Sequence, residues 1–303
     1  MEPIHHPVLL SEVLHELALS ANDAVIDATF GGGGHTRALL EATKPNGVVF
    51  AFDRDPEAIR AAALLPRVHA YNANFDAMET LIRKDYPKAV IHGVLFDFGI
   101  SSLQLADPSL GISFQSDVPL DMRLDRSGAM TAATYLNGVA ESELADAIFA
   151  YGEERASRRI AKAIVAARRR AKLETTGQLV RIIETVLPRR GRLHPATKTF
   201  QALRIVVNDE LGAIARGLTA ARNLLTVGGR IAAISFHSLE DRIVKNAFRE
   251  ATLQCSCQKD QACTCSNGRW QLRTKKPIVA TRTEQKQNPR ARSAKLRVIE
   301  KIV

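Results

Sequence analysis

The segment Asp27-Ala-Thr-Phe-Gly-Gly-Gly-Gly-His35 decides the fold that we expect for this chain of 303 residues. The short apolar run Ala24–Ile26 that precedes it is typical of a buried strand, and residues 36–41 that follow it have helix-forming character. Glycines between a strand and a helix leave backbone N–H groups bare at the helix N-terminus. A ligand can approach closely there, because glycine has no Cβ. The segment therefore predicts a ligand-binding turn at one edge of a sheet.

Strand-like and helix-like runs alternate over the first third of the chain. Three further apolar runs are predicted as strands: 48–53, 68–75 and 93–99. Asp55-Pro56 predicts the start of a helix after the second strand, because Asp is a good N-cap and proline suits the first helical turn. This alternation indicates right-handed βαβ units and a parallel sheet, which places the chain in the α/β class.

The alternation stops near Ser102, and a second kind of sequence follows. Residues 141–186 favour several helices with no strand between them. We therefore predict an all-helical insertion at 106–198, within a sheet domain formed by 1–105 and 199–303.

The sheet is predicted to resume after the insertion. Apolar residues at alternating steps of three and four predict one long helix over Thr199–Leu225, which Gly228-Gly229 would end. The apolar run 230–236 then predicts another strand, and two shorter candidates follow at 278–281 and 295–299.

The net charge of +10 is concentrated in two segments. Residues 155–198 contain 13 basic and 2 acidic side chains, and 266–303 contain 11 basic and 2 acidic, whereas 106–154 contain 2 basic and 9 acidic. Such clustering predicts a polyanionic partner, with RNA or DNA ahead of a membrane, although solvated helix faces with a basic tail would give the same counts. The insertion is therefore a candidate RNA-recognition domain. The arginines expected to contact phosphates are Arg168, Arg169, Arg170, Arg189, Arg190 and Arg192 in the insertion, and Arg290 and Arg292 in the tail.

The start of the chain, Met1–His6, has neither the basic region nor the apolar region of a signal peptide. No run approaches the roughly 20 apolar residues that a membrane span needs. The expected location is therefore the cytoplasm.

The glycine turn does not match the two common phosphate-binding patterns. A dinucleotide fingerprint needs a third glycine, but Thr36 or Arg37 stands at that position, and the phosphate loop ending G-K-[ST] is absent. Acids instead end three of the predicted strands, at Asp27, Asp53 and Asp97, on the rim where parallel sheets bind ligands. These acids would attract the sulfonium and ammonium groups of S-adenosylmethionine and repel the phosphates of a dinucleotide. The spacing therefore favours a methyltransferase over an NAD-type oxidoreductase, with Asp53 placed to accept ribose hydroxyls.

Eight motifs, in family order and over nearly the whole chain, resemble the bacterial small-subunit (16S) ribosomal RNA cytosine-N4 methyltransferases of the RsmH (MraW) type. The motifs are Phe30-Gly-Gly-Gly-Gly-His35, Phe52-Asp-Arg-Asp-Pro56, Leu95-Phe-Asp-Phe-Gly-Ile-Ser-Ser102, Pro119-Leu-Asp-Met-Arg123, Tyr151-Gly-Glu-Glu-Arg155, His194-Pro-Ala-Thr-Lys-Thr-Phe-Gln201, Ser235-Phe-His-Ser-Leu-Glu-Asp-Arg242 and Asn288-Pro-Arg-Ala-Arg-Ser293. The resemblance implies a class I, Rossmann-like methyltransferase sheet with a helical insertion. It also implies transfer of a methyl group from S-adenosylmethionine to N4 of one cytidine in the decoding centre of 16S rRNA. The sequence departs from the family pattern at Leu103 and Ala106, where proline and an acid are usual.

The resemblance further implies which residues hold the methyl donor. Matched motif by motif, they are Gly33, Gly34, His35, Asp53, Phe75, Asp97 and Gln104. Two other classes of function remain open at this point: an NAD-type oxidoreductase, and a non-catalytic assembly factor that binds rRNA.

The exocyclic N4 of cytosine is a poor nucleophile, because its lone pair is delocalised into the ring. An enzyme must flip the base out, accept hydrogen bonds from N4 and align it with the methyl carbon. Our hypothesis is that Asp97 or the backbone at Ser101-Ser102 accepts from N4, with an aromatic residue such as Phe98 stacked on the base. Asp121 and Arg123, in the loop that opens the insertion, are further candidates for the target pocket.

Four cysteines, Cys255, Cys257, Cys263 and Cys265, form two C-x-C pairs in a short window. Four thiolates so close together are able to wrap one Zn²⁺, although the usual zinc spacing is C-x₂₋₄-C. Reduced thiols without metal are the alternative, since disulfides are disfavoured in the cytoplasm. The sequence leaves both possibilities open.

Overall fold

The computed structural model describes residues 7–100, 104–105, 107–189, 191, 194–253 and 269–303. The chain divides into two compact units. The sheet unit consists of Met1–Gly99 and Leu211–Val303, and the helical unit consists of Ile100–Glu210. The insertion predicted at 106–198 falls inside the helical unit, which extends beyond it at both ends.

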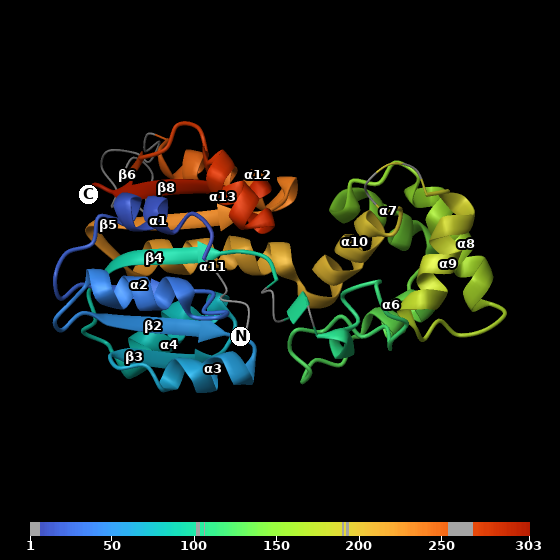
Figure 1. Cartoon of the computed structure of the whole chain (residues 1–303), viewed down its shortest axis with the longest axis horizontal. Coiled ribbons are helices and arrows are strands. Elements are labelled where there is room, and N and C mark those ends of the chain that lie inside the picture. Colours follow the sequence, from blue (N-terminus) through green and yellow to red (C-terminus); the bar gives the residue numbers. More distant parts are fainter. Residues whose placement is uncertain (1–6, 101–103, 106, 190, 192–193, 254–268) are drawn as a thin grey trace, which may run out of the picture. The chain divides into compact units, whose positions relative to one another are not determined.

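The sheet unit is built on one mixed sheet (Figure 1). In the described residues its strands are β1 (Ala24–Asp27), β2 (Val48–Asp53), β3 (Val68–Asn72), β4 (Ile91–Asp97), β5 (Leu225–Ser235), β6 (Trp270–Leu272), β7 (Ile278–Val279) and β8 (Lys295–Lys301). Their spatial order is β3-β2-β1-β4-β5-β8-β6, with β7 paired to β8. Strands β1 to β5 run parallel, and β8 runs antiparallel to β5. This order confirms the predicted class I methyltransferase sheet and adds β6, which the sequence did not predict.

The strand order reverses between β1 and β4, because the chain runs outward from β1 to β3 and then returns to the middle of the sheet. At such a switch point the loops after the two strands diverge and leave room for a ligand at the carboxyl ends. The glycine turn follows β1 at this point, and Asp97 ends β4.

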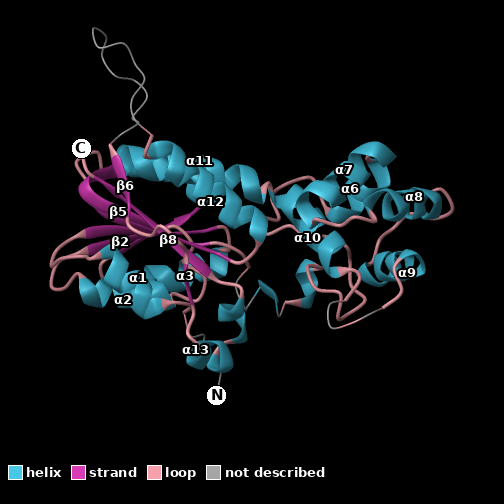
Figure 2. Cartoon of the chain, turned by 90° about the horizontal axis from the view of Figure 1, so that it is seen from above, coloured by secondary structure: helices cyan, strands magenta, loops and turns pink. Residues whose placement is uncertain are grey.

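Helices cover both faces of the sheet (Figures 1 and 2). On one face lie α4 (Met78–Asp85), α11 (Glu210–Leu224) and α12 (Ser238–Ala251). On the other lie α1 (Leu10–Leu17), α2 (Gly34–Ala42) and α3 (Pro56–Ala63), together with α13 (Arg282–Gln287) and the 3-10 turn η3 (Pro289–Arg292). None of the helices in the described ranges combines the length and the apolar character that crossing a bilayer requires.

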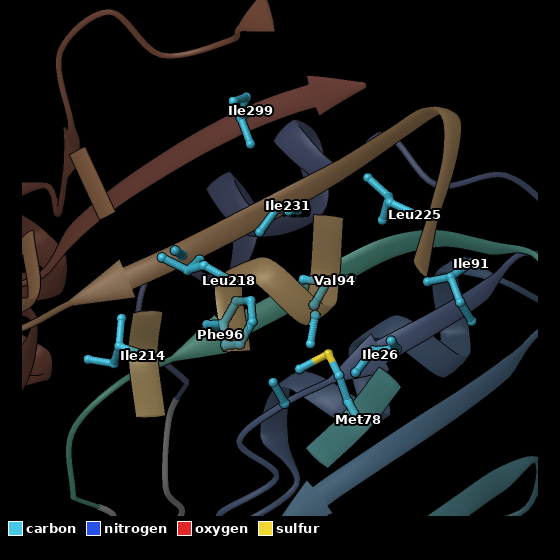
Figure 3. Packing of buried hydrophobic residues seen from close by; sticks show 14 of the residues in the cluster. Ile26, Met78, Ile91, Val94, Phe96, Ile214, Leu218, Leu225, Ile231 and Ile299 are labelled. Carbon is cyan, nitrogen blue, oxygen red and sulfur yellow. The ribbon is translucent and has the colours of Figure 1, made fainter. Parts of the chain in front are cut away.

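Alternating side chains of the central strands build the core between the sheet and helices α4, α11 and α12 (Figure 3). Ile26 of β1 and Phe96 of β4 point to this face and pack with Leu218 of α11. Their neighbours in the strands, Val25 and Leu95, are buried against α1 and α2 on the opposite face. The strands are therefore apolar on both faces, as expected for the covered strands of a parallel sheet.

The helical unit has a core of its own. Its helices are α6 (Ala132–Gly138), α7 (Glu141–Gly152), α8 (Ser157–Arg168), α9 (Thr176–Val186) and α10 (Thr197–Asn208), preceded by the 3-10 turn η2 (Pro108–Leu110). Leu144, Ile160 and Leu179 are among the side chains that are fully buried in it. Capping boxes at Thr131 and Thr175 satisfy the first N–H groups of α6 and α9 and so fix where these helices begin.

The prediction of a single long helix over Thr199–Leu225 is wrong. Asp209 takes a left-handed conformation with φ of 46°, which ends α10 and separates it from α11. The apolar spacing continues across this residue, so periodicity does not reveal the break. Gly228-Gly229 does not end the helix either, because α11 ends at Leu224 and both glycines lie within β5.

Candidate active site

Three acids meet at the carboxyl edge of the sheet. In the register of the sheet, Asp27 lies beside Ala51 of β2 and beside Leu95 of β4. Asp53 and Asp97 lie two residues further along their strands. Because side chains alternate along a strand, all three acids point to the face that α2 covers.

The glycine turn takes a conformation that requires glycine at Gly33. This residue caps α2 with a φ of 72°, and no side chain in the described ranges caps that end of the helix. A Cβ on Gly33 would lie 2.6 Å from Cζ of Phe30, and a Cβ on Gly34 would lie 3.1 Å from Cδ of Pro7. The turn is therefore packed tightly on its inner side, and the N–H groups at the start of α2 stay available to an anionic group of a ligand.

Asp53 ties the glycine turn to the end of β2. Its Oδ2 accepts a hydrogen bond from the backbone N–H of Gly31 at 2.8 Å, and its Oδ1 accepts from the N–H of Asp55 at 2.9 Å. Burial raises the pKa of Asp53, and these two hydrogen bonds partly offset that rise. Each carboxylate oxygen keeps a second lone pair, so Asp53 is able to accept two hydroxyl groups as well.

Asp27 holds the turn from the inside. Its side chain is fully buried, with Oδ2 accepting from Oγ1 of Thr36 at 2.5 Å and Oδ1 accepting from the N–H of Thr29 at 3.2 Å. Burial raises the pKa of Asp27 to about 6. The sequence predicted that Asp27 would attract a ligand together with the other acids. Its buried side chain instead stabilises the glycine turn.

Asp97 has a buried carboxylate oxygen without a hydrogen-bond partner among the described residues. Its N–H donates to Oγ1 of Thr29 at 2.7 Å, and its Oδ2 lies 3.8 Å from Nε2 of the buried His35. The oxygen without a partner in the described part of the chain is Oδ1. Burial raises the pKa of Asp97 to about 7; the positive charge of Arg290 lowers it, and the negative charges of Asp27 and Glu240 raise it. A half-buried acid with an unused acceptor fits a cationic ligand such as S-adenosylmethionine.

Phe75 lies where β3 gives way to a 3-10 turn. Strand β3 ends at Asn72, earlier than predicted, and Phe75 opens η1 (Phe75–Ala77). The ring of Phe75 packs edge-on to Phe96, with 5.5 Å between ring centroids. A Cβ on Gly217 of α11 would lie 2.5 Å from Cδ2 of Phe75, so a glycine in this helix makes room for the ring.

The hypothesis that Phe98 stacks on the target base is wrong for this conformation. Phe98 is only 2% exposed, and its ring is stacked on Phe96 with 5.2 Å between centroids. It belongs to the core that Figure 3 shows around Phe96.

Asp121 and Arg123 form an ion pair within the helical unit. Nε and Nη2 of Arg123 donate to the two carboxylate oxygens of Asp121 at 2.6 Å and 2.8 Å, and Nη1 donates to the carbonyls of Arg126 and Gly128. The bonds from Arg123 lower the pKa of Asp121. The pair therefore closes the loop 121–128, and its carboxylate is a poor proton acceptor near neutral pH. Gln104 also belongs to the helical unit.

The predicted phosphate-binding arginines occupy different environments. Arg168 is half-buried and donates to the backbone carbonyls of Leu136 and Val139, so its guanidinium stabilises the helical unit. The exposed members of the set are Arg169, Arg170, Arg189 and Arg292. Arg290 is half-buried, with its guanidinium 5.8 Å from the ring centroid of Phe236.

Several predicted residues lie outside the described residues, and the roles predicted for them stay predictions. They are Ser101, Arg190, Arg192, Cys255, Cys257, Cys263 and Cys265.

The residues that support the site are not among those predicted from the sequence. The hydroxyl groups of Thr29 and Thr36, within the glycine motif, are the local signal that Asp27 is paired there. No sequence signal marked Gly217 or the half-buried position of Arg290, because both depend on how distant segments pack.

Comparison with known proteins identifies the family. The model of the MraW methylase family matches residues 2–302. "Ribosomal RNA small subunit methyltransferase H" of Geobacter sulfurreducens is 47% identical over 308 residues, which cover 98% of this chain and 99% of the relative. The protein of the same name from Heliobacterium mobile is 44% identical over 312 residues and covers 100% of both chains. A solved rRNA methylase from Streptococcus thermophilus aligns with a TM-score of 0.38 and 13% identity, over 97% of this chain and 93% of that one. The chain therefore belongs to the MraW methylase family, whose members are S-adenosylmethionine-dependent methyltransferases.

Proposed function

We propose that this chain transfers the methyl group of S-adenosylmethionine to N4 of one cytidine in the decoding centre of 16S rRNA. The names of its relatives, ribosomal RNA small subunit methyltransferase H, support an rRNA substrate. The observation that carries the proposal is Asp97, an acid at the switch point with one oxygen that has no hydrogen-bond partner among the described residues. The family match excludes the NAD-type oxidoreductase considered from the sequence. We expect the protein to act in the cytoplasm, on the small ribosomal subunit or its rRNA.

The residues of the sheet unit suit the parts of the donor one by one. Asp53 suits the ribose hydroxyls, because both of its oxygens keep a lone pair. The N–H groups at Gly33-Gly34 suit the donor's carboxylate, since a helix N-terminus favours an anion. Asp97 suits the ammonium and sulfonium groups, and the half-buried ring of Phe75 suits adenine. When bound, the donor supplies an electrophilic methyl group; His35 and Gln104 complete the donor set that the motifs imply.

Asp97 is also the leading candidate for the proton acceptor. N4 loses a proton when it gains a methyl group, and a carboxylate at the end of β4 with an unpartnered oxygen is able to accept that proton. The backbone at Ser101 remains the second candidate to accept from N4. Asp121 is better described as a positioning residue, because its carboxylate is held by Arg123.

Label transfer tests the proposed activity. The protein is incubated with methyl-labelled S-adenosylmethionine and small subunits that lack the modification, and the rRNA is digested to nucleosides. We expect label in N4-methylcytidine alone. Donor binding without label transfer would instead favour a non-catalytic assembly factor, and label in another nucleoside would overturn the assignment of N4.

We further propose that the insertion, 106–198, recognises RNA through an exposed basic face. Side chains at the exposed positions of α8 and just beyond it are Arg158, Arg159, Lys162, Arg169, Arg170 and Lys172. Burial of Ile160, Ile164 and Val165 orients this face away from the core of the helical unit. Phosphate groups are the ligands that such a face suits.

Replacing Arg169 and Arg170 together by Gln should weaken RNA binding and flatten its salt dependence. Each lost phosphate contact lowers the slope of log affinity against log salt by about 0.7–0.9, so the double variant should lose about 1.4–1.8. Filter binding of rRNA across a salt series measures this slope. The double variant Lys44→Gln/Arg60→Gln is a matched control, since its side chains are 60% and 70% exposed on the sheet unit. Equal slopes for both variants would contradict a specific role of the α8 face.

A further inference from the structure

Arg290 reaches the carboxyl edge of the sheet from the C-terminal segment. It lies in η3, where Oδ1 of Asn288 accepts from its N–H at 3.2 Å and the next residue, Ala291, is buried. Its guanidinium lies over the ring of Phe236, 5.8 Å from the centroid. The ring of Phe236 in turn packs on Gly99, where a Cβ would lie 3.3 Å from Cδ2. Because Gly99 follows Asp97 by two residues, Arg290 lies beside the end of β4 instead of extending into solvent.

The charges around Asp97 come from four elements. The acids are Asp27 of β1 and Glu240 of α12, and the basic groups are His35 of α2 and Arg290 of η3. Glu240 is nearly fully buried and accepts from the N–H of Phe236 at 2.7 Å, so it is fixed close to this edge. An arginine stays protonated throughout the pH range in which proteins are folded. Arg290 is therefore the constant positive charge among these groups.

We propose that Arg290 is a positioning residue for Asp97: a permanent cation at the carboxyl edge of the sheet that offsets the acids gathered there while no donor is bound. The proposal rests on the donor site described above, in which Asp97 meets the cationic part of the donor. Three carboxyl groups in a poorly hydrated region disfavour one another's ionisation, and a permanent cation offsets this effect. This role differs from the phosphate contact that the sequence predicted for Arg290, and it separates Arg290 from the exposed Arg292 two residues later.

Removing Arg290 should weaken donor binding to a degree that depends on pH. Asp97 would lose its nearby cation, so its pKa would rise and less of it would be ionised at pH 7. At a pH high enough for Asp97 to be ionised both in the wild type and in the protein without Arg290, the loss of this positive charge would no longer weaken binding of a cationic ligand. The effect of the substitution must therefore depend on pH, which a general loss of structure would not produce.

The test is the affinity for S-adenosylhomocysteine, measured by calorimetry between pH 5.5 and pH 8.5. This product keeps the ammonium group of the donor and does not react. In the wild-type protein, affinity should fall as the pH falls through about 7, the pKa of Asp97. In Arg290→Gln the midpoint should move up by roughly 1 pH unit, which weakens binding about fivefold at pH 7 and by less than about twofold at pH 8.5. The two proteins differ at Arg290 alone, so the difference between the curves reports the effect of removing it.

Two further variants keep the test decisive. Arg290→Lys retains a positive charge and should keep the wild-type midpoint, and Arg292→Gln should leave the whole curve unchanged. Equal weakening at every pH, or an unshifted midpoint in Arg290→Gln, would overturn the role of Arg290 while leaving the donor site intact. A wild-type protein that binds no S-adenosylhomocysteine at any pH would overturn the donor site, and this inference with it.

Discussion

Replacing Asp97 by Asn should weaken donor binding strongly and at the same time stabilise the donor-free protein above pH 7. The amide keeps the size of the carboxyl group but carries no charge, so it loses the attraction for a cationic donor. A charge-assisted hydrogen bond contributes about 1.5–3 kcal/mol, so we expect affinity for S-adenosylhomocysteine to fall about 10- to 100-fold at pH 8.

The gain in stability follows from the sign of the pKa shift. The pKa of Asp97 is about 7 in the folded protein and 3.8 in a model peptide, so the folded state holds the proton more tightly. Ionising Asp97 therefore costs stability, and the wild-type protein should lose stability as the pH rises from about 4 to about 7. The amide in the Asp97→Asn protein does not titrate and so avoids this loss. Because the side chain is 21% exposed and Arg290 is nearby, we expect a modest difference, about 1–2 kcal/mol at pH 8.

Chemical denaturation at pH 4, 6 and 8 measures this difference in the free energy of unfolding. It should be near zero at pH 4 and largest at pH 8. Asp55→Asn is a suitable control, since Asp55 is an N-cap of α3 near the same rim and Asn also caps helices well. The opposite result would be an Asp97→Asn protein that is less stable than the wild type at pH 8. It would show that neighbouring groups stabilise the ionised carboxylate enough to offset the cost of its burial.

The sequence predicted the rim of the site because the information there is local. Apolar runs that end in Asp27, Asp53 and Asp97 identify strands, and the alternation of side chains then brings the acids to one face. The glycine turn is equally local, since its conformation is set within Phe30–Gly33. These features need only strand periodicity and the rule that ligands bind at the carboxyl ends of parallel strands.

The features that the sequence did not predict depend on contacts between distant segments. Arg290 approaches Asp97 because β8 pairs antiparallel to β5 and η3 docks beside Phe236. Its basic surroundings in the sequence instead indicated a phosphate contact. Arg168 was assigned to RNA for the same reason, although two backbone carbonyls hold its guanidinium. Charge counts thus locate a basic segment, but they do not distinguish the arginines that face solvent from those that pair internally.

Replacing Gly33 by Ala should damage the donor site through the backbone. A non-glycine residue in the left-handed conformation costs about 1–2 kcal/mol. The new Cβ would also lie 2.6 Å from Cζ of Phe30, a buried ring held by its own packing. We therefore expect the melting temperature to fall and affinity for S-adenosylhomocysteine to drop at least about tenfold, with both measured on the same protein.

The affinity should suffer because the turn is one connected unit. The N–H of Gly33 donates to the carbonyl of Phe30 at 2.8 Å, and the N–H of Gly31 donates to Asp53 at 2.8 Å. If the turn opens to make room for the alanine side chain, Gly31 is pulled away from Asp53. This movement disturbs both the backbone N–H groups and the carboxylate that suit the donor. Gly138→Ala is the matched control, because a Cβ on Gly138 meets no described atom within 4 Å and the residue is helical, so stability should hold or rise. If Gly33→Ala lowers the melting temperature but leaves the affinity unchanged, the turn supports the fold without contacting the donor. The donor's carboxylate would then have to be held elsewhere.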